Sequence, residues 1–151
     1  MQKTQIAFIG GGNMARAMIA GLRRSGLAPD CIRVGEPSAA ARDELVRDFG
    51  ITAHADNAAA VRGAQLVVLA VKPQEMQRVL QPLSTHLHTD APLLLSIAAG
   101  LRTASLQRWC PGLPVVRAMP NRPALVSAGA AALFAPAEVG AAHRSLAETV
   151  M

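Results

Sequence analysis

The chain has 151 residues, of which 51% are hydrophobic and 17% are charged, a balance that is ordinary for one soluble, folded domain. Its net charge of +5 comes from scattered arginines, and only 3% of the residues are aromatic, which argues against a nucleic-acid partner bound by base stacking. Short apolar runs argue against a signal peptide or a membrane span. The two distant cysteines match no metal or redox spacing, so we expect a reduced, cytoplasmic chain.

The first predicted strand and helix enclose a glycine-rich turn. Residues 6–9 are an apolar run that predicts a buried parallel strand, and the apolar spacing after the turn predicts a helix at 13–24. Gly10, Gly12 and Ala15 form the pattern G-x-G-x-x-A between them. In this pattern the glycines allow a tight turn and a close backbone approach to a pyrophosphate at the positive end of the helix. The segment therefore predicts a nucleotide-binding βαβ unit.

Strands and helices continue to alternate along the rest of the chain. The next predicted elements are a strand at 32–34, a helix between Ser38 and Gly50, a helical turn at 58–62 capped by Asn57, a strand at 66–71 and a helix starting at Pro73. They are followed by a strand at 93–97, a helix at 103–109, strands at 115–117 and 130–134, and a helix at 138–151. This rhythm predicts an α/β fold of Rossmann type, with a doubly wound, mostly parallel sheet in a single three-layer domain over 1–151.

The last helical pattern has no stop signal. The sequence ends inside an amphipathic stretch that carries Leu146 and Val150 on one side. We therefore expect the chain to be a fragment of a longer protein, and we expect these two side chains to form an exposed apolar stripe.

Five segments follow predicted strands and are small, proline-rich or asparagine-bearing: 10–12, 36–38, 70–73, 98–100 and 118–121. Ligands of open α/β sheets bind beyond the carboxyl ends of the strands, where the strand order reverses. Each segment alone is compatible with a plain turn. Together they favour one shared groove for a flat ligand.

Three charged or polar positions leave alternatives open. Glu36 follows the glycine turn at roughly the 20-residue spacing at which an acidic side chain accepts a hydrogen bond from an adenosine ribose, which favours NADH over NADPH. A solvated charge would fit this position too, and Arg33 and Arg42, which flank Glu36, could still receive a phosphate. Lys72 is either a catalytic lysine or, as its place before Pro73 favours, a backbone contact with a solvated ammonium. The histidines at 86 and 88 lack an acidic or cysteine partner, so we expect no metal site.

Four segments in order, at 8–15, 70–73, 96–100 and 117–124, resemble pyrroline-5-carboxylate reductase over essentially the whole chain. The resemblance implies reduction of the imine of 1-pyrroline-5-carboxylate to L-proline in proline biosynthesis, with hydride from NADPH or NADH. It implies no catalytic side chain, because a protonated imine is already electrophilic and mainly has to be oriented.

The resemblance also assigns the binding residues. The cofactor pyrophosphate would be held by Ile9, Gly10, Gly11, Gly12, Asn13 and Met14. Glu36 and Ser38 would lie at the adenosine ribose and Asn57 at the adenine. The ribose and nicotinamide stretch would be lined by Ala70, Val71, Lys72, Pro73, Ala98, Ala99 and Gly100. Asn121 would stand beside the substrate carbon that reacts.

Two departures and two alternatives remain. Arg122 stands where the family usually has threonine, and it would either clamp a carboxylate or face solvent. Glu36 stands where the family often has polar or basic residues associated with NADPH. The resemblance implies a further helical part, absent here, that forms the homo-oligomer and most of the imine pocket. The alternatives are another NAD(P)-dependent imine or hydroxyacid reductase with the same N-terminal unit, deazaflavin-linked reductases included, and a non-catalytic nucleotide-binding module.

Overall fold

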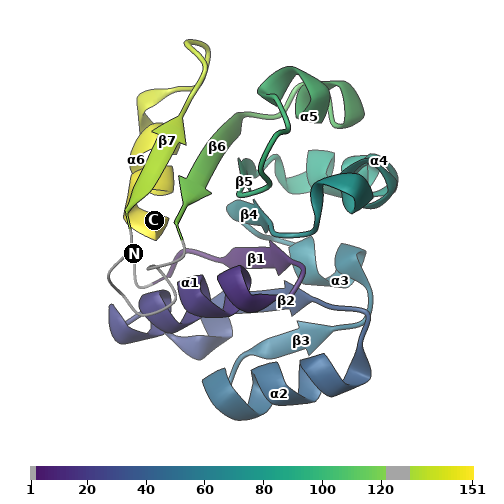
Figure 1. The fold of residues 1–151 in the computed structure, drawn as a ribbon, viewed down its shortest axis with the longest axis vertical. Coiled ribbons are helices and arrows are strands. Elements are labelled where there is room, and N and C mark those ends of the chain that lie inside the picture. The colour runs from purple at the N-terminus through teal and green to yellow at the C-terminus, as the bar shows by residue number, and fades with distance from the viewer. Residues whose placement is uncertain (1–2, 122–129) are drawn as a thin grey trace.

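The computed structural model describes residues 3–121 and 130–151. Its strands are β1 (Ile6–Ile9), β2 (Ile32–Gly35), β3 (Thr52–His54), β4 (Leu66–Leu69), β5 (Leu93–Ser96), β6 (Val115–Pro120) and β7 (Ala131–Phe134). Its helices are α1 (Asn13–Arg24), α2 (Ala39–Phe49), α3 (Asn57–Val61), α4 (Pro73–Asp90), α5 (Thr103–Trp109) and α6 (Ala141–Val150), with a 3₁₀ turn at Pro29–Cys31. The strands form one sheet in the order β3-β2-β1-β4-β5-β6-β7, parallel except for β7, which runs antiparallel to β6 (Figure 1).

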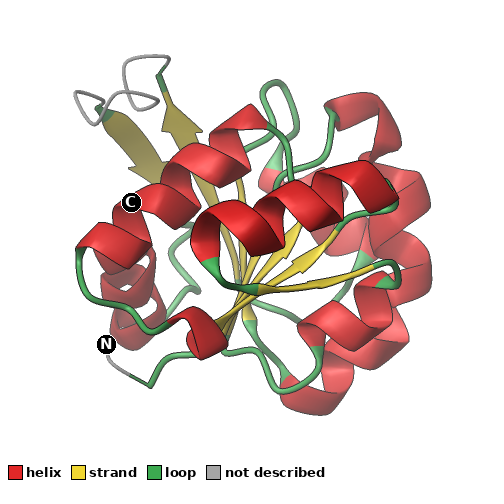
Figure 2. Ribbon diagram, turned by 90° about the horizontal axis from the view of Figure 1, so that it is seen from below, coloured by secondary structure: helices red, strands yellow, loops and turns green. Residues whose placement is uncertain are grey.

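Helices cover both faces of the sheet (Figure 2). One buried cluster joins the sheet to α1, α2 and α6, and a second joins it to α3, α4 and α5. The central strands β1, β4 and β5 are buried along their whole length. Strands covered on both faces need apolar side chains at every position, which is why the sequence shows them as unbroken apolar runs. The predicted three-layer α/β fold is confirmed.

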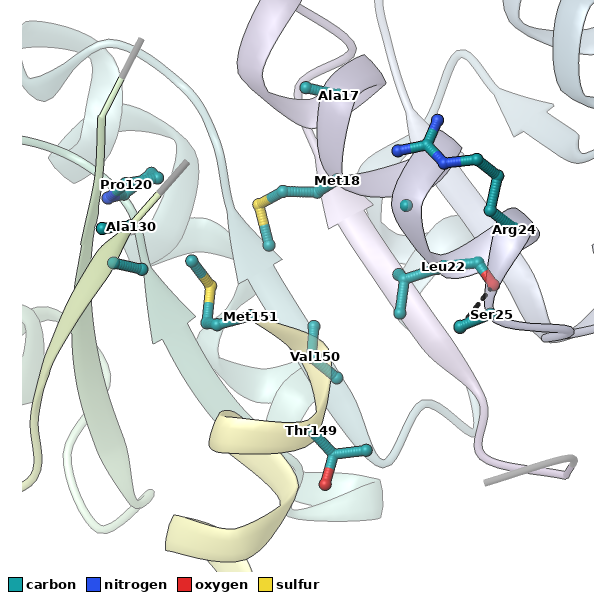
Figure 3. A pocket seen from close by; sticks show the side chains of 12 residues that line it. Ala17, Met18, Leu22, Arg24, Ser25, Pro120, Ala130, Thr149, Val150 and Met151 are labelled. Atoms are coloured by element: carbon teal, nitrogen blue, oxygen red, sulfur yellow. Dashed lines mark hydrogen bonds between the residues drawn. The ribbon is translucent and has the colours of Figure 1, made fainter. Parts of the chain in front are cut away.

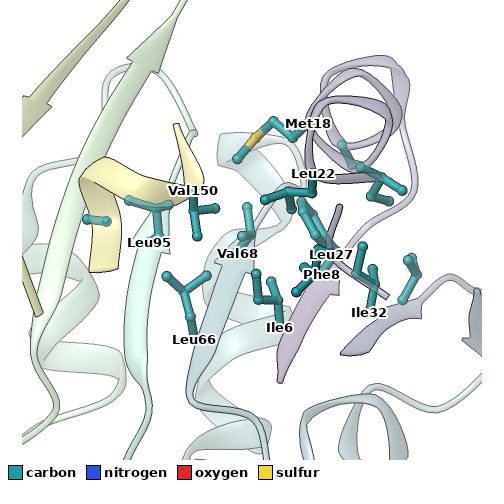
Figure 4. Close-up of a cluster of buried hydrophobic side chains, with 14 of the residues drawn as sticks. Ile6, Phe8, Met18, Leu22, Leu27, Ile32, Leu66, Val68, Leu95 and Val150 are labelled. Atoms are coloured by element: carbon teal, nitrogen blue, oxygen red, sulfur yellow. The ribbon is translucent and has the colours of Figure 1, made fainter. Parts of the chain in front are cut away.

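The core on the α1 face also contains the C-terminal helix. Figure 4 shows Phe8 and Val68 of the sheet together with Leu22 of α1 and Val150 of α6. Val150 is only 5% exposed, and Leu146 is partly buried against the same cluster. The expectation of an exposed stripe at these two positions is therefore wrong, because α6 lays that side on the sheet.

The predicted elements are all present, with some shifted boundaries. The helices predicted at 13–24 and 103–109 have those bounds, whereas α6 begins three residues later than predicted, at Ala141. Asn57 is not the N-cap of the third helix as predicted. Asp56 is the N-cap, and its carboxylate accepts a hydrogen bond from the backbone N–H of Ala58 at 3.0 Å.

Sequence reasoning missed one strand. β3 has three residues, none of them buried, and it lies at the edge of the sheet beside β2. So short a segment has no alternation of apolar and polar residues, and only pairing with β2 gives it strand geometry.

A histidine joins the end of α4 to the turn after α5. His88 Nδ1 lies 2.6 Å from the carbonyl oxygen of Ser84, and Nε2 lies 2.6 Å from that of Pro111. Carbonyl oxygens only accept hydrogen bonds, so both contacts are satisfied together only when both ring nitrogens carry a proton. These contacts, that with Ser84 first, raise the pKa of His88 above its usual value.

The raised pKa of His88 makes this contact dependent on pH. A histidine whose pKa is higher in the folded state adds its full stability below its unfolded pKa of about 6.5 and loses it as the pH rises through the folded pKa. We predict that His88→Ala lowers the midpoint of thermal unfolding more at pH 5.5 than at pH 9. Thermal unfolding at both values measures this, with the exposed His86 as the matched His86→Ala control. An equal effect of His88→Ala at both pH values would contradict the prediction.

Candidate functional site

The strand order reverses between β1 and β4. The carboxyl ends of three strands meet there, because the Gly10 N–H donates to the Gly35 carbonyl at 2.9 Å and the Ala70 N–H donates to the Ile9 carbonyl at 2.8 Å. Chain segments leave such a reversal toward opposite faces of the sheet and open a crevice between them. A cavity of about 650 Å³ lies at this position.

Four groups of residues line this cavity. The glycine turn and the end of β2 supply Gly10, Gly11, Gly12, Gly35, Glu36 and Pro37. The start of α3 supplies Ala55, Asp56, Asn57 and Ala58, and the segment after β4 supplies Ala70, Val71 and Lys72. One side of α4 completes it with Glu75, Arg78, Val79, Pro82, Leu83 and His86.

The glycine turn ends in an open helix terminus. Gly10 has φ +98°, and a Cβ there would lie 2.8 Å from the Ala70 carbonyl oxygen, so the turn requires glycine. Gly12 is the N-cap of α1, no side chain caps the helix, and a Cβ at Gly12 would meet nothing within 4 Å. The first N–H groups of α1 therefore face free space with the positive end of the helix dipole behind them. That arrangement attracts an anion.

Glu36 closes the cavity on the β2 side. One carboxylate oxygen accepts from the Gly11 N–H at 3.0 Å and the other from the Ser38 N–H at 2.9 Å. Arg42 donates to the Glu36 carbonyl at 2.9 Å and to the Pro37 carbonyl at 2.8 Å. The half-buried Glu36 side chain is thus held at the mouth of the glycine turn, with its negative charge beside the open end of α1.

Asn57 occupies the space that the side chain of residue 35 would take. A Cβ on Gly35 would lie 2.1 Å from the Asn57 Oδ1, so α3 can approach β2 only because residue 35 is glycine. Asn57 therefore lines the cavity, although Asp56 and not Asn57 caps the helix.

The cavity contains eight of the seventeen predicted site residues: Gly10, Gly11, Gly12, Glu36, Asn57, Ala70, Val71 and Lys72. Ile9, Asn13, Met14, Pro73, Ala98, Ala99 and Gly100 are at the same sheet edge or the start of α1 and do not line it. The Ser38 hydroxyl accepts from the Ala41 N–H at 3.3 Å and caps α2. The Asn121 Oδ1 accepts from the Ala130 N–H at 3.0 Å and joins β6 to β7. Arg122 lies outside the described residues.

Sequence reasoning missed the α4 side of the cavity. Val79 and Leu83 belong to the apolar stripe of α4, which the pattern alone assigns to the core, and Glu75 and Arg78 form an ion pair on the same helix. The available signal was this pair in the first turns of a helix that starts at Pro73, but a surface pair of opposite charges is common on any helix.

A second cavity of about 310 Å³ lies elsewhere. Met18 and Leu22 of α1, Val150 and Met151 at the chain end, and Pro120 of β6 surround it (Figure 3). None of its lining residues belongs to the glycine turn.

Other kinds of site find no support in the described part of the chain. Among residues 3–121 and 130–151, no group of three His, Cys, Asp or Glu side chains is placed to hold a metal ion. Within the same ranges, no helix combines the length and the apolar character needed to span a membrane. Cys31 and Cys110 are both buried, and burial raises the pKa of the Cys110 thiol.

Several known proteins have sequences or folds similar to this chain. A pyrroline-5-carboxylate reductase of Pseudomonas aeruginosa is 47% identical over 144 residues, which are 95% of this chain and 52% of that protein. The structure of a pyrroline-5-carboxylate reductase from Coxiella burnetii has a TM-score of 0.94 and 38% identity, covering 98% of this chain and 55% of that one. A pyrroline carboxylate reductase of Plasmodium falciparum with NADP bound, at 23% identity and TM-score 0.86 over 99% of this chain and 55% of that one, shares the fold.

The chain spans about half the length of the curated relatives it matches. A family model described as "NADP oxidoreductase coenzyme F420-dependent" matches residues 5–100, from β1 to just beyond β5. That range contains the glycine turn, Glu36 and all the lining residues of the larger cavity. The chain belongs to this family of NADP oxidoreductases.

Proposed function

We propose that the chain, over residues 1–151, is the cofactor domain of a pyrroline-5-carboxylate reductase, which reduces 1-pyrroline-5-carboxylate to L-proline in proline biosynthesis. The observation that carries the proposal is the uncapped N-terminus of α1 behind a glycine turn, at the reversal of strand order. Relatives that are 38% to 47% identical and bear this enzyme name support the choice of substrate.

The cavity fits the adenosine half of a nicotinamide dinucleotide. The pyrophosphate would lie against Gly12 and the first N–H groups of α1, those of Asn13 and Met14, which have no acceptor one turn earlier in the helix. Ile9 and Gly10 bring the backbone to this position, and Gly11 lies beside Glu36. Glu36 and Ser38 would then adjoin the adenosine ribose, with Asn57 toward the adenine.

The nicotinamide half would lie along the next strand ends. Ala70, Val71, Lys72 and Pro73 follow β4, and Ala98, Ala99 and Gly100 follow β5. The three alanines and the glycine among them have little or no side chain, which leaves room for a flat ring at this part of the sheet edge. Asn121 follows β6, the next strand along, and would adjoin the substrate. A bound reduced nicotinamide supplies a hydride. The chain's own residues orient the two reactants, which contributes much of the acceleration for an imine that is already electrophilic.

The rest of the enzyme would come from sequence that the relatives have outside the matched region, since the chain spans about half of their length. We place there a helical part that completes the imine pocket and forms a homo-oligomer. Cys31 and Cys110 are buried in two different core clusters and so do not pair with each other, which accords with a reducing compartment such as the cytoplasm.

Glu36 favours NADH over NADPH in this proposal. Its carboxylate, 3.0 Å from the Gly11 nitrogen, would repel a 2′-phosphate on the adjoining ribose. Arg42, the first cationic residue after β2 in the sequence, already donates to two loop carbonyls, which leaves it less free to compensate for that repulsion. The relative from Plasmodium falciparum has NADP bound, so this preference is a property to be measured on the chain itself.

Cofactor binding tests the proposed site. We predict that the chain binds NADH or NADPH in a calorimetric titration, and that Gly12→Ala weakens binding at least about tenfold, because the new methyl group fills the pyrophosphate position. Gly12 has φ −74° and open space around its Cβ, so Gly12→Ala should not lower the thermal midpoint. Gly21→Ala is the matched control, since its Cβ also meets nothing within 4 Å, on the far part of α1. Absence of binding by the unaltered chain would remove the proposed site.

Cofactor preference tests the role of Glu36. We predict that Glu36→Ser shifts the ratio of the NADPH to the NADH dissociation constant by about tenfold toward NADPH, because it removes the like charge beside the 2′-phosphate. Asp43→Ser makes the same charge change on the exposed surface of α2 and should leave the ratio unchanged. An equal ratio in Glu36→Ser and the unaltered chain would show that Glu36 does not select the cofactor.

The substrate is tested on the whole protein that contains this chain. We predict that 1-pyrroline-5-carboxylate causes oxidation of NADH or NADPH and that proline accumulates. The oxidation is measured as the loss of absorbance of the reduced nicotinamide. Oxidation of NADH or NADPH by the oxo acid that corresponds to a 3-hydroxy acid would instead identify a different reductase. Cofactor binding without turnover of any of these substrates would identify a nucleotide-binding module.

A further inference from the structure

We propose that Arg16 is a positioning residue for the cofactor: it fixes the peptide between Gly11 and Gly12 so that the Gly12 N–H points to the pyrophosphate position. The inference rests on the dinucleotide site proposed above and adds a residue to it. Arg16 does not line the cavity, and its effect would be exerted through the backbone of the glycine turn.

Arg16 connects the glycine turn to α2. Its Nε donates to the Gly11 carbonyl oxygen at 3.1 Å. An Nη of the same guanidinium donates to the Ala41 carbonyl at 3.4 Å and to the Glu44 carboxylate at 2.9 Å, and the other lies 3.7 Å from an Asp48 carboxylate oxygen. The side chain is 22% exposed. Because these bonds anchor the guanidinium to α2, it presents a fixed donor to the turn.

The bond to Gly11 determines where the Gly12 N–H points. The Gly11 C=O and the Gly12 N–H belong to one planar, trans peptide unit, so they point in opposite directions. Holding the carbonyl on the α2 side directs the N–H away from α2, where Gly12 lines the cavity. A rotated peptide would instead turn the Gly11 carbonyl toward the phosphates, and its partial negative charge would repel them.

This peptide requires an external restraint because glycine stands on both sides of it. Glycine has a wide range of backbone angles, so a peptide between two glycines rotates more freely than others. The preceding peptide is held separately, since the Gly11 N–H donates to Glu36 at 3.0 Å. A Cβ on Gly11 would lie 2.6 Å from the Leu45 Cδ1 of α2, so a side chain at this position would have to displace the buried Leu45. Arginine suits the task because its planar fork bonds the turn and α2 at once, which a lysine ammonium does less well.

The experiment compares ligands with and without a pyrophosphate. We predict that Arg16→Met weakens calorimetric binding of NADH and of ADP-ribose about tenfold, the loss expected for one hydrogen bond to a charged group. Adenosine, measured by ligand-observed NMR, should change less than twofold because it lacks the pyrophosphate. Arg47→Met is the matched control: Arg47 also pairs with Asp48, at 2.9 Å, but is exposed and has no bond to the turn in the described structure.

Each result separates the proposals. If circular dichroism shows that Arg16→Met does not fold, Arg16→Lys takes its place in the binding measurements. Arg16→Lys should give a smaller loss of affinity for NADH and no loss of affinity for adenosine. NADH binding within twofold of the unaltered chain in a folded variant would overturn the role of Arg16 and leave the proposed function standing. Equal losses for NADH and adenosine would also overturn it, because they indicate a general effect on the packing of α1 against α2. Failure of the unaltered chain to bind NADH, NADPH and ADP-ribose would overturn the proposed function and this inference together.

Discussion

The N–H groups at the start of α1 are the constraint around which the site is built. A helix start normally gains a serine, threonine, aspartate or asparagine whose side chain bonds these donors, as Ser38 does for α2 and Asp56 for α3. Gly12 offers no such side chain, so the donors stay open at the edge of the sheet. The absence of a capping side chain costs some helix stability and leaves a place for an anion. A buried strand ahead of the turn and a helix packed on the sheet hold that place still.

The glycine turn is held by residues that sequence patterns do not assign to it. Glu36 bonds the N–H of Gly11, and Arg16 bonds its carbonyl oxygen. Both side chains are themselves fixed, Glu36 through the Ser38 N–H and Arg16 through Glu44 of α2. A flexible backbone segment thus acquires a defined shape from its charged neighbours, without a large side chain in the site. The charge of Glu36 acts at the same time on the turn and on the ribose position proposed for the cofactor.

Much of the fold could be predicted because its elements are written in local patterns. The buried strands are unbroken apolar runs, and the helices show apolar residues at three- to four-residue spacing. β3 and the cap of α3 were missed or misplaced, since a three-residue edge strand has no periodicity and Asp56 and Asn57 are equally good capping types. Leu146 and Val150 were predicted to be exposed, because a sequence does not show which element will cover a stripe. The sheet under α6 covers these two.

For the candidate site, the sequence by itself determined the glycine turn, the acidic residue after β2 and the short strand-end segments, because each depends on residue type at a fixed local spacing. The tertiary structure decided which of these come together. It placed β1 beside both β2 and β4, brought one side of α4 to the cavity, and set Asn57 in the space left by Gly35. It also placed Arg16 against Gly11 and α2. Contacts between α1, α2 and α4 depend on how the helices pack on the sheet. No local sequence pattern encodes that packing, so these contacts could not be predicted from the sequence.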